Sequence, residues 1–163
     1  MTQLAELGSS MAALHARIAK LLATCDPAVL QRTMVTEEWK VLDVIGHVNA
    51  WGLEFFSEAR HMAENPGKPF TYEINTANNY DDENNRLVQE RKGWGVEQHV
   101  EENRRLSEVI RAFFESFAGE LPDHAVPLPW EPRPTSIAEV LRVHARHGRD
   151  HLDEILEALG VEN

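Results

Sequence analysis

The chain has 163 residues, a formal net charge of −11 at pH 7 and one cysteine, Cys25. This length fits one domain, residues 1–163, with a core large enough to fold without a disulfide or a structural metal. The 27 acidic residues outnumber 16 scattered basic ones, so nucleic acid and anionic membranes are poor partners. One cysteine excludes an internal disulfide, no run of about eighteen apolar residues indicates a membrane span, and no secretory signal pattern is seen, so we expect a cytoplasmic protein.

Apolar residues recur at steps of three and four almost throughout the chain, which predicts an all-α fold. The first helix illustrates the pattern, because Leu7, Met11, Leu14 and Ile18 share one face. We expect four long helices over residues 3–24, 36 or 37–63, 96–118 and 136–160, and a short helix over residues 81–91.

Capping residues, proline and glycine mark the breaks between these helices. Asp26 and Pro27 predict a fresh start after the first helix, because aspartate caps a helix and proline suits its first turn. The segment ENPGKPF ends the second helix, and GELPDHAVPLPWEPRPT is too rich in proline to continue the helix before it. The last helix begins with the capping-box pair Ser136 and Glu139 and stops at Gly160.

Each long helix is apolar along one side only, so the four are expected to bury these sides against one another. The connection from Glu64 to Gly95 is long enough to cross the bundle. The predicted fold is therefore a single all-α four-helix bundle with a long crossover connection, in which a simple up-down-up-down order is not required.

Three histidines of the last helix lie where apolar residues are expected. At about 100° per residue, His144 and His151 fall among the inward residues and His147 lies at their edge. His147 and His151 are four residues apart, so two imidazoles on successive turns are spaced to bind one metal ion. A lone inward histidine is more often a core residue, but burying several unpartnered imidazoles costs roughly 1–3 kcal/mol each, which a shared ion would offset.

Three familiar metal motifs do not fit this pattern. Zincin proteases carry glutamate directly after the first histidine, where this chain has Gly148. Ferritin-like di-metal sites need two ExxH helices, and only Glu58 with His61 has that spacing. Zinc fingers need cysteines that the chain lacks. A third ligand has to come from another helix.

The segment EEWKVLDVIGHVNAW supplies the best third ligand, His47, with Trp51 one turn further along. Periodicity alone predicts a surface position for His47, at the boundary of its helix's apolar side.

This segment and the C-terminal HGRDHLDEI together resemble the DinB/YfiT-like superfamily of small four-helix bundles, including its DfsB-type members. The resemblance spans essentially the whole chain in order and length, although only these two motifs are specific. By position, it implies that Trp39, His47, His147 and His151 are the tryptophan and the three histidines that recur in such proteins. It also implies that the three histidines hold one divalent ion in a cleft at one end of the bundle.

The better-understood members of that superfamily are thiol-dependent transferases, isomerases and hydrolases, so the resemblance implies an enzyme. Three imidazole ligands leave open positions, at which a water would become acidic or a thiolate would be activated. We therefore expect a divalent metal, which is Zn, Ni, Fe or Mn from the imidazole donors, together with a low-molecular-weight thiol. His144 is not a matched ligand and is expected in the core or behind the ligands.

Inward polar residues on two other helices are candidates for a substrate cavity. Asn103 lies near the centre of the inward side of the helix over residues 96–118, and Asn84 lies on the apolar side of the short helix, where similar relatives often have asparagine. We assign Asn84, Asn103 and Trp51 to substrate binding. The alternative, in which the asparagines bond backbone carbonyls or water, stays open, and Cys25 is not expected to be catalytic.

Two functions are consistent with these features. The first is a metal-dependent enzyme that hydrolyses a small molecule or transfers a low-molecular-weight thiol to it. The alternative is a non-catalytic, stress-related bundle that binds or sequesters a small ligand. Such bundles often pair through helix faces, so we expect a homodimer.

Overall fold

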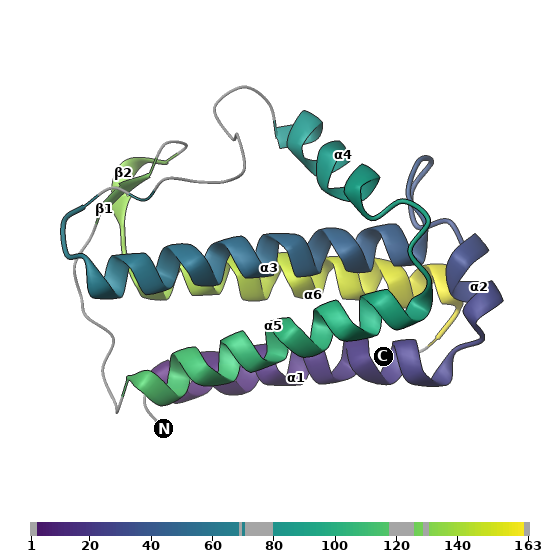
Figure 1. The fold of residues 1–163 in the computed structure, drawn as a ribbon, viewed down its shortest axis with the longest axis horizontal. Coiled ribbons are helices and arrows are strands. Elements are labelled where there is room, and N and C mark those ends of the chain that lie inside the picture. Colours follow the sequence, from purple (N-terminus) through teal and green to yellow (C-terminus); the bar gives the residue numbers. More distant parts are fainter. Residues whose placement is uncertain (1–2, 69, 71–79, 118–125, 129–130, 162–163) are drawn as a thin grey trace.

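The computed structural model of this chain describes residues 3–68, 70, 80–117, 126–128 and 131–161 (Figure 1). The elements, in chain order, are α1 (Gln3–Thr24), α2 (Pro27–Arg32), α3 (Val41–Glu64), α4 (Tyr80–Glu90), α5 (Val96–Ser116), β1 (Val126–Leu128), β2 (Glu131–Thr135) and α6 (Ile137–Leu159). The predicted all-helical bundle of four long helices is confirmed.

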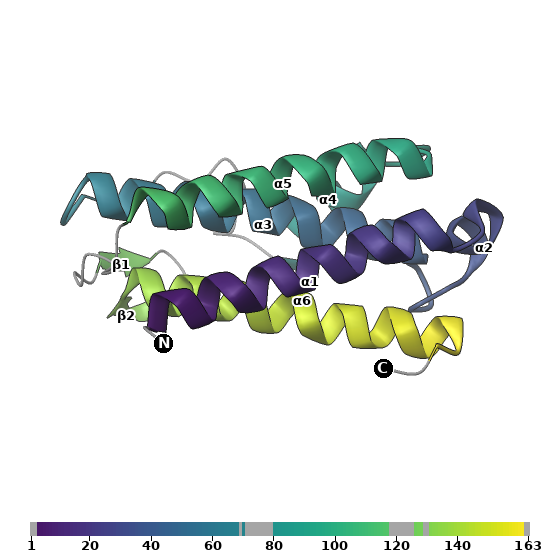
Figure 2. The ribbon, with the colours of Figure 1, turned by 90° about the horizontal axis from the view of Figure 1, so that it is seen from below.

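The long helices α1, α3, α5 and α6 form the bundle, and their largest contacts join α1 to α5, α3 to α6, α3 to α5 and α1 to α6. Helices α1 and α6 run in one direction, and α3 and α5 run in the other (Figure 1). Figure 2 shows α1 lying along α6, with α5 along the other side of α1. Because α3 and α5 are parallel, the chain returns along the bundle between them, which confirms the long crossover connection. Helix α4 belongs to this connection and contacts α3.

Helix α3 begins at Val41, several residues later than the sequence predicted. Residues 36–39 form a tight turn instead, in which the Thr36 hydroxyl accepts hydrogen bonds from the backbone N–H groups of residues 38 and 39. The Asp43 carboxylate then accepts a hydrogen bond of 2.9 Å from the Lys40 backbone N–H, which caps the helix. The predicted start at residue 36 or 37 was wrong because threonine bonds its own turn more readily than it extends a helix.

The other predicted breaks hold. Asp26 caps α2 through a hydrogen bond of 2.8 Å from the Ala28 N–H. Helix α6 begins after Ser136, whose hydroxyl accepts from the Glu139 N–H, and ends at Gly160 in the left-handed conformation, with φ 65°. The proline-rich stretch before α6, for which no strand was predicted, contains an antiparallel pair of short strands, β1 and β2.

Two groups of buried apolar side chains fill the bundle. One lies at the end where α2 closes the bundle and joins α1, α3 and α6, with members that include Ile18, Leu30, Val41, Ile45 and Ile155. The second lies towards the other end and joins all four long helices, with members that include Met11, Phe56, Leu106, Phe113 and Leu141. The burial of these apolar side chains is the main stabilising contribution to the fold.

A polar contact in the interior ties α1 to α5. The His15 Nδ1 and Asn103 Oδ1 atoms are 2.9 Å apart, and the Asn103 amide N–H donates to the His15 carbonyl at 3.1 Å. The His15 ring also stacks on His144, at 5.8 Å between ring centroids. His144 is fully buried among these rings and Phe55 and Phe56, as expected for a core histidine.

Among the described helices, no segment combines the length and the hydropathy that are needed to cross a lipid bilayer.

The close packing around Gly52 predicts that a larger side chain at this position lowers the stability of the fold. A Cβ added there would lie 2.5 Å from Leu106 Cδ2 and 2.9 Å from His144 Cε1. We expect Gly52→Val to lower the free energy of unfolding by about 2 kcal/mol, measured by urea denaturation. Ala13→Val, at an exposed site on α1, is the control and should cost well under about 1 kcal/mol. Equal stability of the two variants would contradict this tight packing.

Candidate metal centre

Three histidines from two helices converge between α3 and α6. His47 comes from α3, and His147 and His151 come from successive turns of α6. One ring nitrogen of each lies within 4.8 Å of those of the other two. We call His47, His147 and His151 the histidine cluster.

The rings of the histidine cluster are close enough to bind one metal ion together. The Nε2 atoms of His47 and His147 are 3.0 Å apart. The His47 ring centroid lies 5.0 Å from those of His147 and His151, and the latter two are 4.7 Å apart. Ligand nitrogens around a tetrahedral zinc ion are about 3.3 Å apart, so small side-chain rotations would complete such a site.

His47 is buried, with 2% of its surface exposed, rather than at the helix boundary. The surface position predicted from periodicity was wrong because two elements cover the ring. One is α6, and the other is the turn before α3, whose Trp39 ring packs on His47 at 5.0 Å between centroids. The tryptophan that the resemblance singled out is therefore a wall of the histidine cluster.

Glu154 orients the third histidine. Its carboxylate lies 2.8 Å from His151 Nδ1, so that nitrogen carries a proton and donates it. The lone pair of a neutral His151 ring then sits on Nε2, the nitrogen free to bind an ion. Glu154 was not predicted as a site residue, although its spacing of three residues after the predicted ligand His151 was the available signal.

Burial keeps the two inner rings of the histidine cluster neutral. It lowers the pKa of His47 to about 2, aided by the neighbouring His147, His151 and Arg91. It lowers the pKa of His147 to about 4, aided by His151. Metal ligation needs unprotonated imidazole, so both rings are in the required state near neutral pH.

The same two rings have unsatisfied nitrogens. The Nδ1 atoms of His47 and His147 are buried and have no hydrogen-bond partner among the described residues. Their Nε2 atoms satisfy only each other, and one of the two must donate the proton. An ion would accept both Nε2 lone pairs at once, so the donor set fits a divalent metal that favours imidazole, such as Zn, Ni, Fe or Mn.

Trp51 and Asn84, two of the predicted substrate residues, meet at the interface of α3 and α4. The Trp51 indole N–H donates to Asn84 Oδ1 at 2.9 Å. Trp51 also contacts Phe55 and Tyr80 and lies one turn along α3 from His47. The sequence predicted both residues but not their direct contact, and their assignment to substrate binding stays a prediction.

Asn103 lies elsewhere, in the contact of α1 with α5. Both ends of its side-chain amide bond to His15, a different histidine from those of the cluster. Its hydrogen bond to the His15 carbonyl corresponds to the alternative in which an inward asparagine bonds a backbone carbonyl, and its assignment to substrate binding stays a prediction.

A polar cavity of about 560 Å³ adjoins the site. Trp39, which contacts His47, lines it together with Lys40, Arg91, Trp94 and His99. Arg91 is fixed there by hydrogen bonds to the Glu102 carboxylate and to the Leu87 carbonyl. The volume falls within the range of small-molecule sites, which is about 300–1,000 Å³.

Comparison with known proteins identifies the family of this chain. The model of the DinB superfamily matches residues 11–155. This protein belongs to the DinB superfamily. The predicted resemblance is thereby confirmed.

This DinB-superfamily chain also resembles a solved enzyme. The crystal structure of the mycothiol-dependent maleylpyruvate isomerase superposes with a TM-score of 0.72 and 14% sequence identity, covering 98% of this chain and 70% of that one. A histidine-to-alanine mutant of that isomerase gives a TM-score of 0.70 at 14% identity, with the same coverage. At this identity the likeness establishes a shared fold. No curated protein matches the sequence significantly.

The contact of Glu154 with His151 predicts an effect on metal affinity. Glu154→Gln should weaken Zn²⁺ binding about tenfold, because carboxylates behind a ligand histidine contribute about 10–100-fold and this one is half-exposed. Competition with a chromogenic chelator measures the change. Glu157→Gln, one turn further along α6, is the control, and an equal loss in both variants would show only a general effect of charge.

Buried His99 predicts acid destabilisation of the metal-free protein. Burial, aided by Arg91 and opposed by Asp43, lowers its pKa from 6.5 to about 4. The unfolded chain therefore binds a proton in this interval that the folded chain does not, so stability is complete above pH 6.5 and falls towards pH 4.

Between about pH 7 and pH 5, the wild type should lose about 2 kcal/mol of its free energy of unfolding through His99. The variant His99→Gln should not show this part of the loss. Urea denaturation of both proteins at the two pH values measures it. Identical pH dependence in the wild type and the variant would contradict a neutral buried His99.

Proposed function

We propose that this chain is a divalent-metal-dependent enzyme that acts on a small molecule, by hydrolysis or by transfer of a low-molecular-weight thiol. The observation that carries the proposal is the convergence of three ring nitrogens, within 4.8 Å of one another, at the meeting of α3 and α6. Membership of the DinB superfamily supports it.

Each member of the histidine cluster has a distinct part in this proposal. His47 is buried and His147 is half-buried, both rings are neutral, and they would hold the ion through Nε2. His151 is more exposed and would hold it through the nitrogen opposite its contact with Glu154. Three protein ligands are typical of catalytic rather than structural zinc, because one position stays open for a reactant.

A divalent ion held there supplies Lewis acidity, which lowers the pKa of a thiol or a water molecule and polarises a carbonyl. The chain provides the surroundings for that chemistry. The Trp39 ring covers one side of His47 and excludes water from it. The adjoining cavity carries charges of both signs, because Glu38 and Asp43 line it beside Lys40, Arg91 and Lys92, and Arg91 is already paired with Glu102.

Thiol transfer has the stronger support of the two reactions. A solved structure that shares this fold over 98% of the chain is a mycothiol-dependent isomerase, which favours a reaction that depends on a low-molecular-weight thiol. We propose that a low-molecular-weight thiol enters beside Trp39, and that Trp51 and Asn84 contact the second substrate.

Metal analysis tests the proposed site. Protein purified without a nickel column should retain a divalent ion, whereas His147→Ala and His151→Ala should lose most of it after dialysis, since each removes one of three ligands. His61→Ala, which removes a histidine outside the histidine cluster, is the control and should retain the ion. Undiminished metal in both cluster variants would refute the assignment.

A thiol panel then separates the two reactions. Turnover of candidate electrophiles should depend on mycothiol, glutathione or cysteine if the thiol is a substrate, and should proceed without thiol if the enzyme is a hydrolase. In either case a chelator should abolish turnover. Tight ligand binding that is indifferent to chelators, with no turnover, would instead favour the non-catalytic bundle.

A further inference from the structure

The face of α6 opposite the histidine cluster carries three arginines. Arg142, Arg146 and Arg149 follow one another at steps of four and three residues, which places them on one side of the helix. Arg149 is about 160° around the helix from His147, at about 100° per residue. The arginines therefore face away from the histidine cluster.

These arginines are not fully neutralised by the protein. Arg142 pairs with Glu139, at 2.7 Å, whereas Arg146 and Arg149 form no ion pair with any described residue. Arginines on other helices do have partners, such as Arg104 with Glu101 and Arg111 with Glu115. Like charges at this spacing repel one another on a helix, by about 0.2–0.5 kcal/mol per pair.

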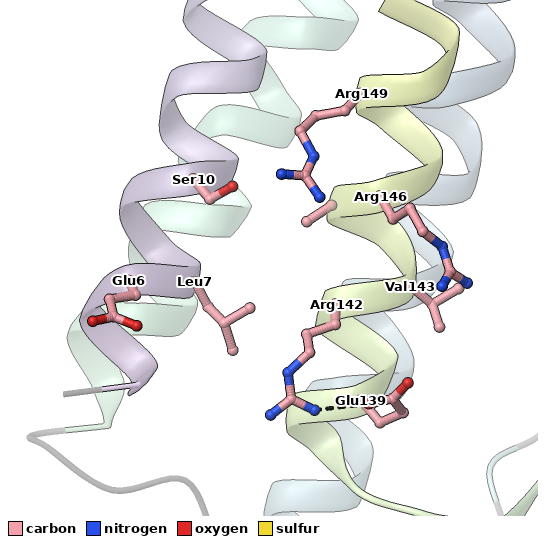
Figure 3. A pocket seen from close by; sticks show the side chains of 9 residues that line it. Glu6, Leu7, Ser10, Glu139, Arg142, Val143, Arg146 and Arg149 are labelled. Atoms are coloured by element: carbon pink, nitrogen blue, oxygen red, sulfur yellow. Dashed lines mark hydrogen bonds and ion pairs between the residues drawn. The ribbon is translucent and has the colours of Figure 1, made fainter.

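The arginines border a cavity of about 410 Å³ between α1 and α6. We call it the arginine groove, and its lining residues are Glu6, Leu7, Ser10, Glu139, Arg142, Val143, Ala145, Arg146 and Arg149. Figure 3 shows the guanidinium groups of Arg142 and Arg149 extending towards α1, and that of Arg146 extending along the other side of α6. Ser10 projects from α1 into the space that Arg149 faces (Figure 3).

The donors of the arginine groove suit an anion. Arg142 and Arg149 present planar groups that bind carboxylate or phosphate through paired hydrogen bonds, and the Ser10 hydroxyl adds a donor from the opposite wall. Two carboxylates, Glu6 and Glu139, also line the groove, and Arg142 already neutralises the second. Arg142 and Arg149 are the positive groups that extend towards α1 in this groove, while Arg146 extends along the other side of α6.

We propose that the arginine groove binds a small molecule with two anionic groups, either carboxylates or phosphates, between Arg142, Arg149 and Ser10. The size of the cavity favours a small molecule, because it falls within the range of about 300–1,000 Å³ for such sites. The ligand contacts the face of α6 that turns away from the histidine cluster. It is thus bound separately from the proposed reaction.

Titration of the full-length, metal-free protein tests this site. Succinate and pyrophosphate serve as probes, and their binding is followed by calorimetry and by amide chemical shifts. We expect saturable binding with a Kd of about 1 mM at low salt, weakened several-fold when sodium chloride reaches about 0.2 M. Whichever probe binds more tightly shows whether the groove prefers carboxylate or phosphate.

Two double variants with the same change in charge separate the groove from general electrostatics. Arg142→Gln with Arg149→Gln should raise the Kd at least about tenfold. Arg104→Gln with Arg111→Gln, which removes two paired arginines from α5, should leave it within about twofold. Equal weakening by both pairs, or no saturable binding by the wild type, would overturn the proposal.

A third variant excludes binding at the histidine cluster. His147→Ala with His151→Ala should leave the anion affinity unchanged, and loss of binding in that variant would overturn the arginine groove as the site. Circular dichroism of every variant confirms that it is folded. The anion titration is independent of the metal analysis. Either proposal, the anion site or the metal-dependent enzyme, can therefore be refuted without the other.

Discussion

The close packing of α3 against α6 is the constraint on which the site depends. Gly52 permits it, because a Cβ there would lie 2.9 Å from His144 Cε1 on α6, whereas a Cβ at Gly148 would meet Leu14 of α1, at 2.5 Å. At this separation the His47 ring reaches the space between two turns of α6, where its Nε2 lies 3.0 Å from that of His147. A wider spacing of the two helices would separate His47 from the pair formed by His147 and His151.

Burial then determines what these imidazoles do. A buried ring stays neutral, since charging it without water or a partner is costly. The buried histidines of this bundle occur in two arrangements. His15 bonds to Asn103 and so joins two helices. The inner rings of the histidine cluster bond only to each other through their Nε2 atoms, and an ion between them would accept both Nε2 lone pairs at once.

Helix α6 serves two different surfaces. One side carries His147 and His151 against α3, and the other carries the arginine groove against α1. The bundle fixes the relative placement of these surfaces, because rings and guanidinium groups on one rigid helix keep their angular separation. A fold shared at 14% identity says nothing about such side chains. The chemistry has to be derived from the residues that this chain places on each helix face.

Local patterns in the sequence determined most of the helices and the pairing of His147 with His151, because helical periodicity and caps depend on residues only a few positions apart. The same limit explains the misplaced start of α3, where a threonine turn competes with the helix, and the unexpected pair of short strands before α6. The resemblance to a family, rather than periodicity, selected His47 and Trp39. Only the tertiary structure decided the burial of His47, the bond between Trp51 and Asn84, and the orientation of His151 by Glu154. The first two depend on contacts between residues far apart in the chain, and the third depends on a rotamer that spacing does not fix.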